Sequence, residues 1–180
     1  VRNSIHKLYN GLAYGENHNH NDFSYSNLCK TIDHISANLC DVQNSVITKL
    51  EFGLNVPTII PAEHIIKRNI LMHDYKAHNL NKKYNGKGEL KQFDHTNYIL
   101  KTYDKAKQYK LDQNILRIEV RFENNKELKK LGIYNILDLK DKSKLTKLYY
   151  QLLRRFEQLI IVDDIENISE RLMEDAEMFN

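Results

Sequence analysis

The sequence has no long hydrophobic run and only two cysteines. No apolar stretch approaches the ~20 residues of a membrane-spanning helix, and no segment has the pattern of a signal peptide. We therefore expect a cytoplasmic protein with no membrane partner. Cys29 and Cys40 lie on a predicted helix and at its exit. This placement is typical of small buried hydrophobic residues, and it argues against a disulfide or a zinc site.

Charge is distributed unevenly along the 180 residues, a length that suits one domain with its own core. Residues 162–180 hold seven acidic side chains and one basic one, whereas residues 1–161 hold 26 basic and 17 acidic side chains. We therefore expect a domain at 1–161 and an acidic helical tail at 162–180. A basic body suits a polyanionic partner, although charge alone favours a merely solvated, lysine-rich surface. Because the chain begins at Val1 in a strand-like pattern, we also expect residues to be missing upstream.

Hydrophobic periodicity predicts an α+β protein. Alternation of apolar and polar residues predicts strands at about 4–9, 46–56, 96–105 and 114–122, the first ending in a turn at Asn10-Gly11. Helical spacing predicts helices at about 26–39 and 61–72, a short one within 123–133, a long one from Asp141 or Ser143, and one at 163–178. Residues 73–94 are polar and are predicted to be a loop with a short strand near Tyr84. This order indicates a largely antiparallel sheet with helices packed on one face, followed by C-terminal helices.

The polar faces of three predicted strands carry unusual side chains. They are Glu51 and Asn55; Lys101, Tyr103 and Lys105; and Arg117, Glu119 and Arg121. Carboxylates can hold Mg²⁺ or Mn²⁺, an ammonium can help a phenol of usual pKa near ~10 to ionise, and the cations can hold phosphates. The alternative is a structural hairpin, because cross-strand Glu–Arg pairs stabilise sheets and tyrosine favours strands.

The order of five short motifs resembles the rolling-circle replication initiators of the filamentous-phage gene II/X type. The motifs, which span about residues 3–150, are "SIHKLYNG", "NDFSYSNL", "ITKLEFGLNV", "LKTYDKAKQ" and "NILRIEVRF". The resemblance implies a sheet of the HUH or ferredoxin-like kind. It also implies single-strand DNA nicking and strand transfer at a phage or plasmid origin, through a tyrosine that forms a 5′-phosphotyrosyl bond and frees a 3′-OH.

The resemblance also assigns roles to residues of this chain. Tyr103 would be the nucleophile and Lys105 its electrostatic partner, with Tyr98 and Tyr109 as lesser nucleophile candidates. Glu51 and Glu119 would bind Mg²⁺ or Mn²⁺. The residues expected to contact DNA are Lys7, Lys101, Arg117 and Arg121. Single-stranded or origin DNA is the expected partner, together with replication proteins.

The chain lacks the His-hydrophobic-His motif that is usual in this class. The nearest match is His18-Asn-His20, in a polar loop, which gives a weaker pair of metal-ligand candidates. Three functions therefore compete: a tyrosine nickase, a DNA-binding relative that does not cut, and a structural or interaction protein whose acidic tail docks on a basic partner.

Overall fold

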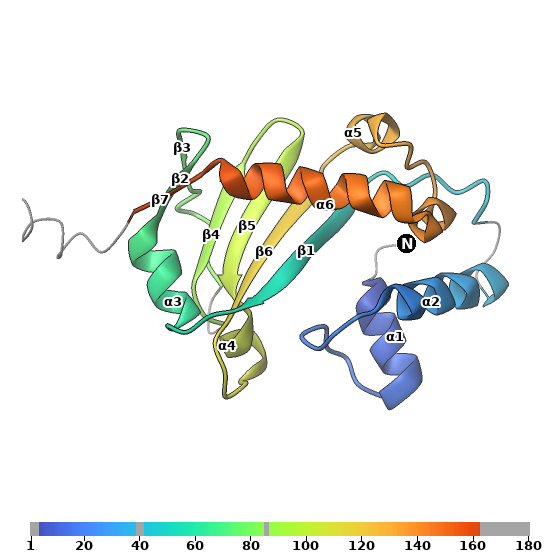
Figure 1. The fold of residues 1–180 in the computed structure, drawn as a ribbon, viewed down its shortest axis with the longest axis horizontal. Coiled ribbons are helices and arrows are strands. Elements are labelled where there is room, and N and C mark those ends of the chain that lie inside the picture. Colours follow the sequence, from blue (N-terminus) through green and yellow to red (C-terminus); the bar gives the residue numbers. More distant parts are fainter. Residues whose placement is uncertain (1–3, 39–41, 85–86, 163–180) are drawn as a thin grey trace, which may run out of the picture. The chain divides into compact units, whose positions relative to one another are not determined.

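A computed structural model describes residues 4–38, 42–84 and 87–162 as a mixed α+β protein (Figure 1). Its helices are α1 (Ile5–Tyr14), α2 (Tyr25–Asn38), α3 (Ala62–His64), the π-helix η1 (Ile65–Asn69), α4 (Lys105–Tyr109), α5 (Asn125–Lys130), the 3₁₀ helix η2 (Ile136–Lys140) and α6 (Lys142–Glu157). Its strands are β1 (Leu50–Pro57), β2 (Ile70–His73), β3 (Lys76–Ala77), β4 (Leu90–Asp94), β5 (Tyr98–Asp104), β6 (Ile115–Phe122) and β7 (Leu159–Ile161). The α+β class is confirmed. The predicted helix at 163–178 and Cys40 lie outside the described residues.

The strands form two sheets. The larger is a four-stranded antiparallel sheet with the order β1-β6-β5-β4, and the smaller has the order β3-β2-β7 (Figure 1). Strands β4 and β5 pair from Leu90 opposite Tyr103 to Asp94 opposite Ile99. Since β5 and β6 are the central strands, the two motifs "LKTYD" and "ILRIEVRF" are direct neighbours. None of the helices in the described ranges is long and apolar enough to cross a membrane.

The chain groups into two compact units. The first comprises Val1–Phe52, Thr96–Tyr98 and Val120–Leu153, and the second comprises Gly53–His95, Ile99–Glu119 and Arg154–Asn180. Buried side chains of the first unit include Ile32, Ile35, Phe122, Leu128, Ile133, Leu139, Leu148 and Leu152. Those of the second unit include Ile66, Ile70, Phe93, Leu100, Ile115 and Ile118.

The strand predicted at 4–9 is wrong, because these residues begin α1. The side chain of Ser4 accepts a hydrogen bond from the backbone N–H of Lys7 and so caps the helix. The helix continues through Asn10 and Gly11, where we expected a turn, and it ends at Gly15 with a φ of 72°. Apolar residues at 5, 8, 9 and 12 have the i, i+3, i+4, i+7 spacing of one helix face, and only 5 and 9 fit alternation.

Helix α2 confirms the prediction for 26–39 in the residues that are described. The side chain of Ser24 accepts a hydrogen bond from the backbone N–H of Asn27, and Ile32 and Ile35 are buried. Cys29 is half-buried and forms no disulfide with any described residue. Helices α5 and α6 also confirm the predictions for 123–133 and for a helix starting near Asp141.

The segment 46–94 differs more from the prediction. Strand β1 starts at Leu50 rather than 46, and the predicted helix at 61–72 stops at Asn69, directly before β2 begins at Ile70. Tyr84 is not in a strand; the strand of this polar region is β4, at Leu90–Asp94. Strand β7 replaces the last residues of the predicted long helix. These strands are too short for alternation to identify them reliably.

The predicted strands at 96–105 and 114–122 are confirmed as β5 and β6, but α4 lies between them. The side chain of Asp104 accepts a hydrogen bond from the backbone N–H of Lys107 and caps this helix. Lys105 is therefore the first residue of α4, and it does not belong to the strand face on which we expected it.

Candidate functional site

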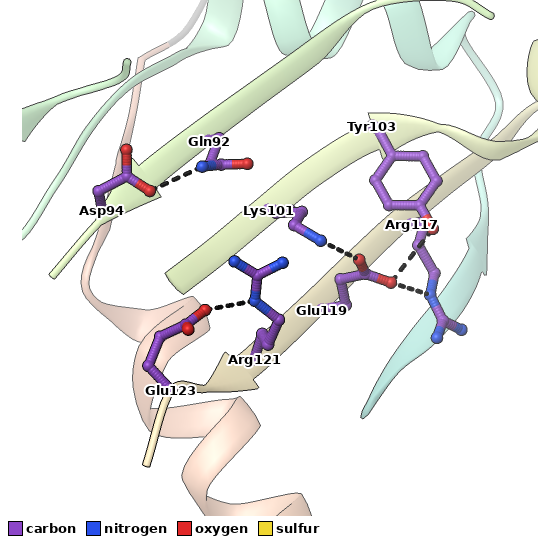
Figure 2. Close-up of polar contacts among 8 residues, drawn as sticks. All are labelled: Gln92, Asp94, Lys101, Tyr103, Arg117, Glu119, Arg121 and Glu123. Atoms are coloured by element: carbon purple, nitrogen blue, oxygen red, sulfur yellow. Dashed lines mark hydrogen bonds and ion pairs between the residues drawn. The ribbon is translucent and has the colours of Figure 1, made fainter. Parts of the chain in front are cut away.

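A network of charged and phenolic side chains lies on one face of β5 and β6 in the second unit (Figure 2). Its centre is the carboxylate of Glu119. Lys101 Nζ donates to Glu119 Oε1 at 3.1 Å, the hydroxyl of Tyr103 donates to Oε2 at 3.1 Å, and Arg117 Nε donates to Oε2 at 3.3 Å. Arg117 Nη1 also donates to Asn55 Oδ1 at 3.1 Å. The polar faces of the two strands therefore coincide at Lys101, Tyr103, Arg117 and Glu119.

This network is buried. Tyr103 is 4 % exposed, and the side chains of Glu119 and Lys101 are 5 % and 11 % exposed. All seven residues of β5 are buried, so both faces of this strand are covered. One cover is the ring of Tyr84, which stacks on the ring of Tyr103 with centroids 5.2 Å apart. A DNA phosphate therefore has no direct path to the hydroxyl of Tyr103 in this conformation.

The electrostatics of the network oppose ionisation of Tyr103. Burial, and then the negative charge of Glu119, hold the pKa of this phenol well above its usual value, and the positive charge of Arg117 offsets only part of that effect. A nucleophilic phenolate requires a shift in the opposite direction. In the described structure the phenol is a hydrogen-bond donor to Glu119.

Lys105, the expected electrostatic partner of Tyr103, lies over the ring of this tyrosine. Its ammonium lies 5.5 Å from the ring centroid of Tyr103 and 4.9 Å from that of Tyr109. The side chain is almost completely buried, at 1 % exposure. Lys105 thus packs between two aromatic rings, as cation–π contacts allow.

The two predicted carboxylate ligands belong to different units. Glu51 is exposed on the part of β1 that lies in the first unit, whereas Glu119 is buried in the second unit. Within the described ranges, no group of three or more His, Cys, Asp or Glu side chains is placed to hold a metal ion. Both oxygens of Glu119 already accept hydrogen bonds from cations or from a phenol. The residues present therefore fit an internal ion network better than an Mg²⁺ or Mn²⁺ site.

The other predicted DNA contacts lie in the first unit. Lys7 is in the first turns of α1 and not on a strand. Arg121 Nε donates to the carboxylate of Glu123 (Figure 2). The same carboxylate also accepts from Lys49. Arg121 is thus paired with an acidic side chain two residues away on the chain.

His18 and His20, the weaker metal candidates, have a structural role in the loop after α1. Their rings stack with centroids 4.1 Å apart. The amide of the buried Asn10 donates to the carbonyl of His18 at 2.8 Å and to Asn21 Oδ1 at 2.9 Å, and the Nε2 of His18 bonds to Glu16. Asn10 therefore anchors the polar loop to the helix.

Sequence reasoning missed the contribution of β4 to this polar face. Gln92 lies opposite Lys101 in the sheet, and its amide donates to Asp94 Oδ1 at 2.7 Å (Figure 2). Burial opposes the ionisation of Asp94, but hydrogen bonds from Asn79 and Gln92 outweigh it and lower the pKa. The sequence signal was the short alternation in "LKQFD", which we assigned to a loop.

A second polar group in this unit is the buried His73 together with the half-buried His95. The Nε2 of His73 is 3.0 Å from the carbonyl oxygen of Arg155, so in the neutral ring this nitrogen carries the proton. The Nδ1 then accepts from His95 Nε2 at 2.8 Å. Burial and the neighbouring His95 lower the pKa of His73 to about 4.

We expect His73 to make folding sensitive to acid. Its pKa falls from 6.5 in the unfolded chain to about 4 in the folded one, so the unfolded state binds the proton first. The stabilisation is complete above about pH 6.5 and is lost as the pH falls from there through about 4, by about 3 kcal/mol in total. Urea unfolding of wild type and His73→Gln between pH 7 and 4.5 would measure it, because the glutamine amide can still donate to Arg155.

The control for this prediction is His34→Gln, at an exposed position on α2. Wild type and the His34 variant should lose stability more steeply on acidification than the His73 variant. If the free energy of unfolding falls equally with pH in all three proteins, the prediction that the folded protein keeps His73 neutral is wrong.

Comparison of the chain with protein-family models, with curated proteins and with solved structures finds no match.

Proposed function

We propose that this chain is a single-stranded-DNA-binding domain of the rolling-circle replication-initiator type, and that its β5–β6 network is a structural centre and not a nicking site. The proposal includes the HUH-like or ferredoxin-like sheet that the motif order implies. Its partner is single-stranded or origin DNA, and binding requires no metal ion.

One observation carries the proposal. Strands β5 and β6 bring together Lys101, Tyr103, Arg117 and Glu119, and a single site built from the two motifs requires this. The four side chains nevertheless form hydrogen bonds with one another and are largely buried. The adjacency supports the initiator-type resemblance, and the burial favours binding over cutting. Residues 1–161 contain 26 basic and 17 acidic residues, and this excess of positive charge would attract DNA phosphates.

The experiment combines two readouts on the same protein. Fluorescence anisotropy with a labelled single-stranded oligonucleotide pool, from 50 to 300 mM salt, should show affinity that falls steeply with salt, because each phosphate contact releases counterions. A denaturing gel of the same mixture with Mg²⁺ or Mn²⁺ should show no protein–DNA adduct. Absence of binding even at 50 mM salt would overturn the proposal.

Nicking by Tyr103 is the second candidate, because its hydroxyl lies 3.1 Å from a carboxylate that could accept the proton. It requires Tyr84 and the surrounding chain to move aside. If an adduct forms, mass mapping should locate the DNA remnant, and Tyr103→Phe should abolish it while binding is kept. Tyr98→Phe is the control, since Tyr98 is a buried tyrosine of the same strand.

A further inference from the structure

Helix α6 has an exposed face in the first unit, and none of its residues belongs to the hydrogen-bond network around Glu119. Leu148 and Leu152 are buried and define the packed side. With 3.6 residues per turn, the opposite side carries a contiguous set of residues, all of them exposed except Leu153, which is half-buried. They are Lys142, Ser143, Thr146, Lys147, Tyr149, Tyr150 and Leu153.

Two tyrosines dominate this face. Tyr149 is 48 % exposed and Tyr150 is 61 % exposed, and their rings contact edge to face with centroids 5.7 Å apart. The high strand propensity of tyrosine does not explain these two residues, because they lie in a helix. Packing in the core does not explain them either, because both rings are exposed. Although the edge of one ring lies against a face of the other, both rings therefore keep exposed surface on which a ligand can stack.

The charge on this face is positive within the first unit. From Lys142 to Leu153 the helix contains no acidic residue, and its one acidic residue, Glu157, is the last of the helix and belongs to the second unit. Lys142 and Lys147 lie at the two sides of the exposed face, and the ammonium of Lys142 lies 4.8 Å from the ring centroid of Tyr25. Lys144, nearer the packed side, is paired with Asp138. For Lys147, no acidic side chain of the described residues forms such a pair. Positive charge flanking exposed aromatic rings is the combination that binds single strands, with phosphates on the cations and bases on the rings.

We infer that this face of α6, defined by Lys142, Lys147, Tyr149 and Tyr150, is a stacking surface for single-stranded nucleic acid. The inference rests on the proposed function and adds the surface that contacts the bases. An anionic membrane is the competing partner for a basic helix. It is disfavoured because the large aliphatic side chains Leu148 and Leu152 are buried, which leaves little apolar surface to insert.

The test uses the full chain and a 20-nucleotide oligo-dT, with oligo-rU of equal length as a second arm. Base–aromatic stacking is worth roughly tenfold or more in affinity per base, so Tyr149→Ala/Tyr150→Ala should weaken binding of at least one oligonucleotide by about that factor. Lys147→Glu should weaken it and reduce the salt dependence. The chain has eleven tyrosines and no tryptophan, so stacking should also quench the intrinsic tyrosine emission, and less so in the double variant.

The matched control is Tyr134→Ala, a tyrosine that is 53 % exposed in the same unit but not on α6. It should leave binding unchanged, and circular dichroism should show that all variants are folded. If wild type binds but the α6 variants bind equally well, this inference fails and the proposed function stands. If wild type binds neither oligonucleotide, both fail. Loss of binding to vesicles containing phosphatidylserine, with unchanged oligonucleotide binding, would assign the surface to a membrane instead.

Discussion

Glu119→Gln should lower the free energy of unfolding by about 3 kcal/mol, because it leaves two buried cations without their counter-charge. The glutamine keeps the shape of the side chain, and its amide oxygen can still accept from the hydroxyl of Tyr103. It cannot compensate the ammonium of Lys101, whose side chain is 11 % exposed, or the guanidinium of Arg117, which is 15 % exposed. Urea unfolding at pH 7 measures the loss.

The control is Glu123→Gln, which removes a carboxylate from the same stretch of chain. Glu123 also bonds two cations, Lys49 and Arg121, but the side chain of Lys49 is 59 % exposed and water can solvate it. The expected loss is below about 1 kcal/mol, as for other surface ion pairs. Equal losses in the two variants would show that burial does not set the strength of the β5–β6 network.

A second substitution separates charge from packing. If the cost of Glu119→Gln comes from uncompensated charge, then adding Lys101→Met should recover part of it, since the methionine needs no counter-ion. If the cost comes from altered packing, the double variant should be less stable than the single one. Additive losses would therefore contradict the ionic explanation.

The central strands could be predicted from sequence because their patterns are long and regular. In "LRIEVRF" apolar and polar residues alternate over the whole strand, so both its existence and its polar face follow from the period. The coincidence of this face with that of Tyr103 does not follow from the period, because it depends on which strands are neighbours in the sheet. What could not be predicted is that the face is covered, because Tyr84 comes from a segment about 20 residues away with no regular pattern.

The wrong predictions have a common physical origin. In the segment from Ile5 to Tyr9, all three apolar residues fit the helical period but only Ile5 and Tyr9 fit alternation, and the capping bond from Ser4 also favours the helix. In "LKQFD" the strand is only five residues long, so pairing with β5 determines its structure more than its own alternation does. Short elements depend on tertiary contacts that a single sequence does not display.

Gly53→Ala should also lower the free energy of unfolding by about 3 kcal/mol, because a methyl group has no space between β1 and β6. A Cβ atom at this position would lie 2.2 Å from the carbonyl oxygen of Ile118 and 2.6 Å from the Cα of Glu119. Both are backbone atoms of a central strand, so neither can move without disturbing the sheet. Thermal or urea unfolding of the variant measures this cost.

Gly11→Ala provides the control, since the same chemical change occurs where there is room. Gly11 lies inside α1, and the nearest atom to a methyl group at this position would be 4.0 Å away. Alanine there should raise stability by roughly 0.5–1 kcal/mol through its better helix propensity. Opposite signs for the two glycines are therefore expected. A Gly53 variant as stable as wild type would mean that β1 does not approach β6 this closely, and the bond from Arg117 to Asn55, which depends on that approach, would also be in doubt.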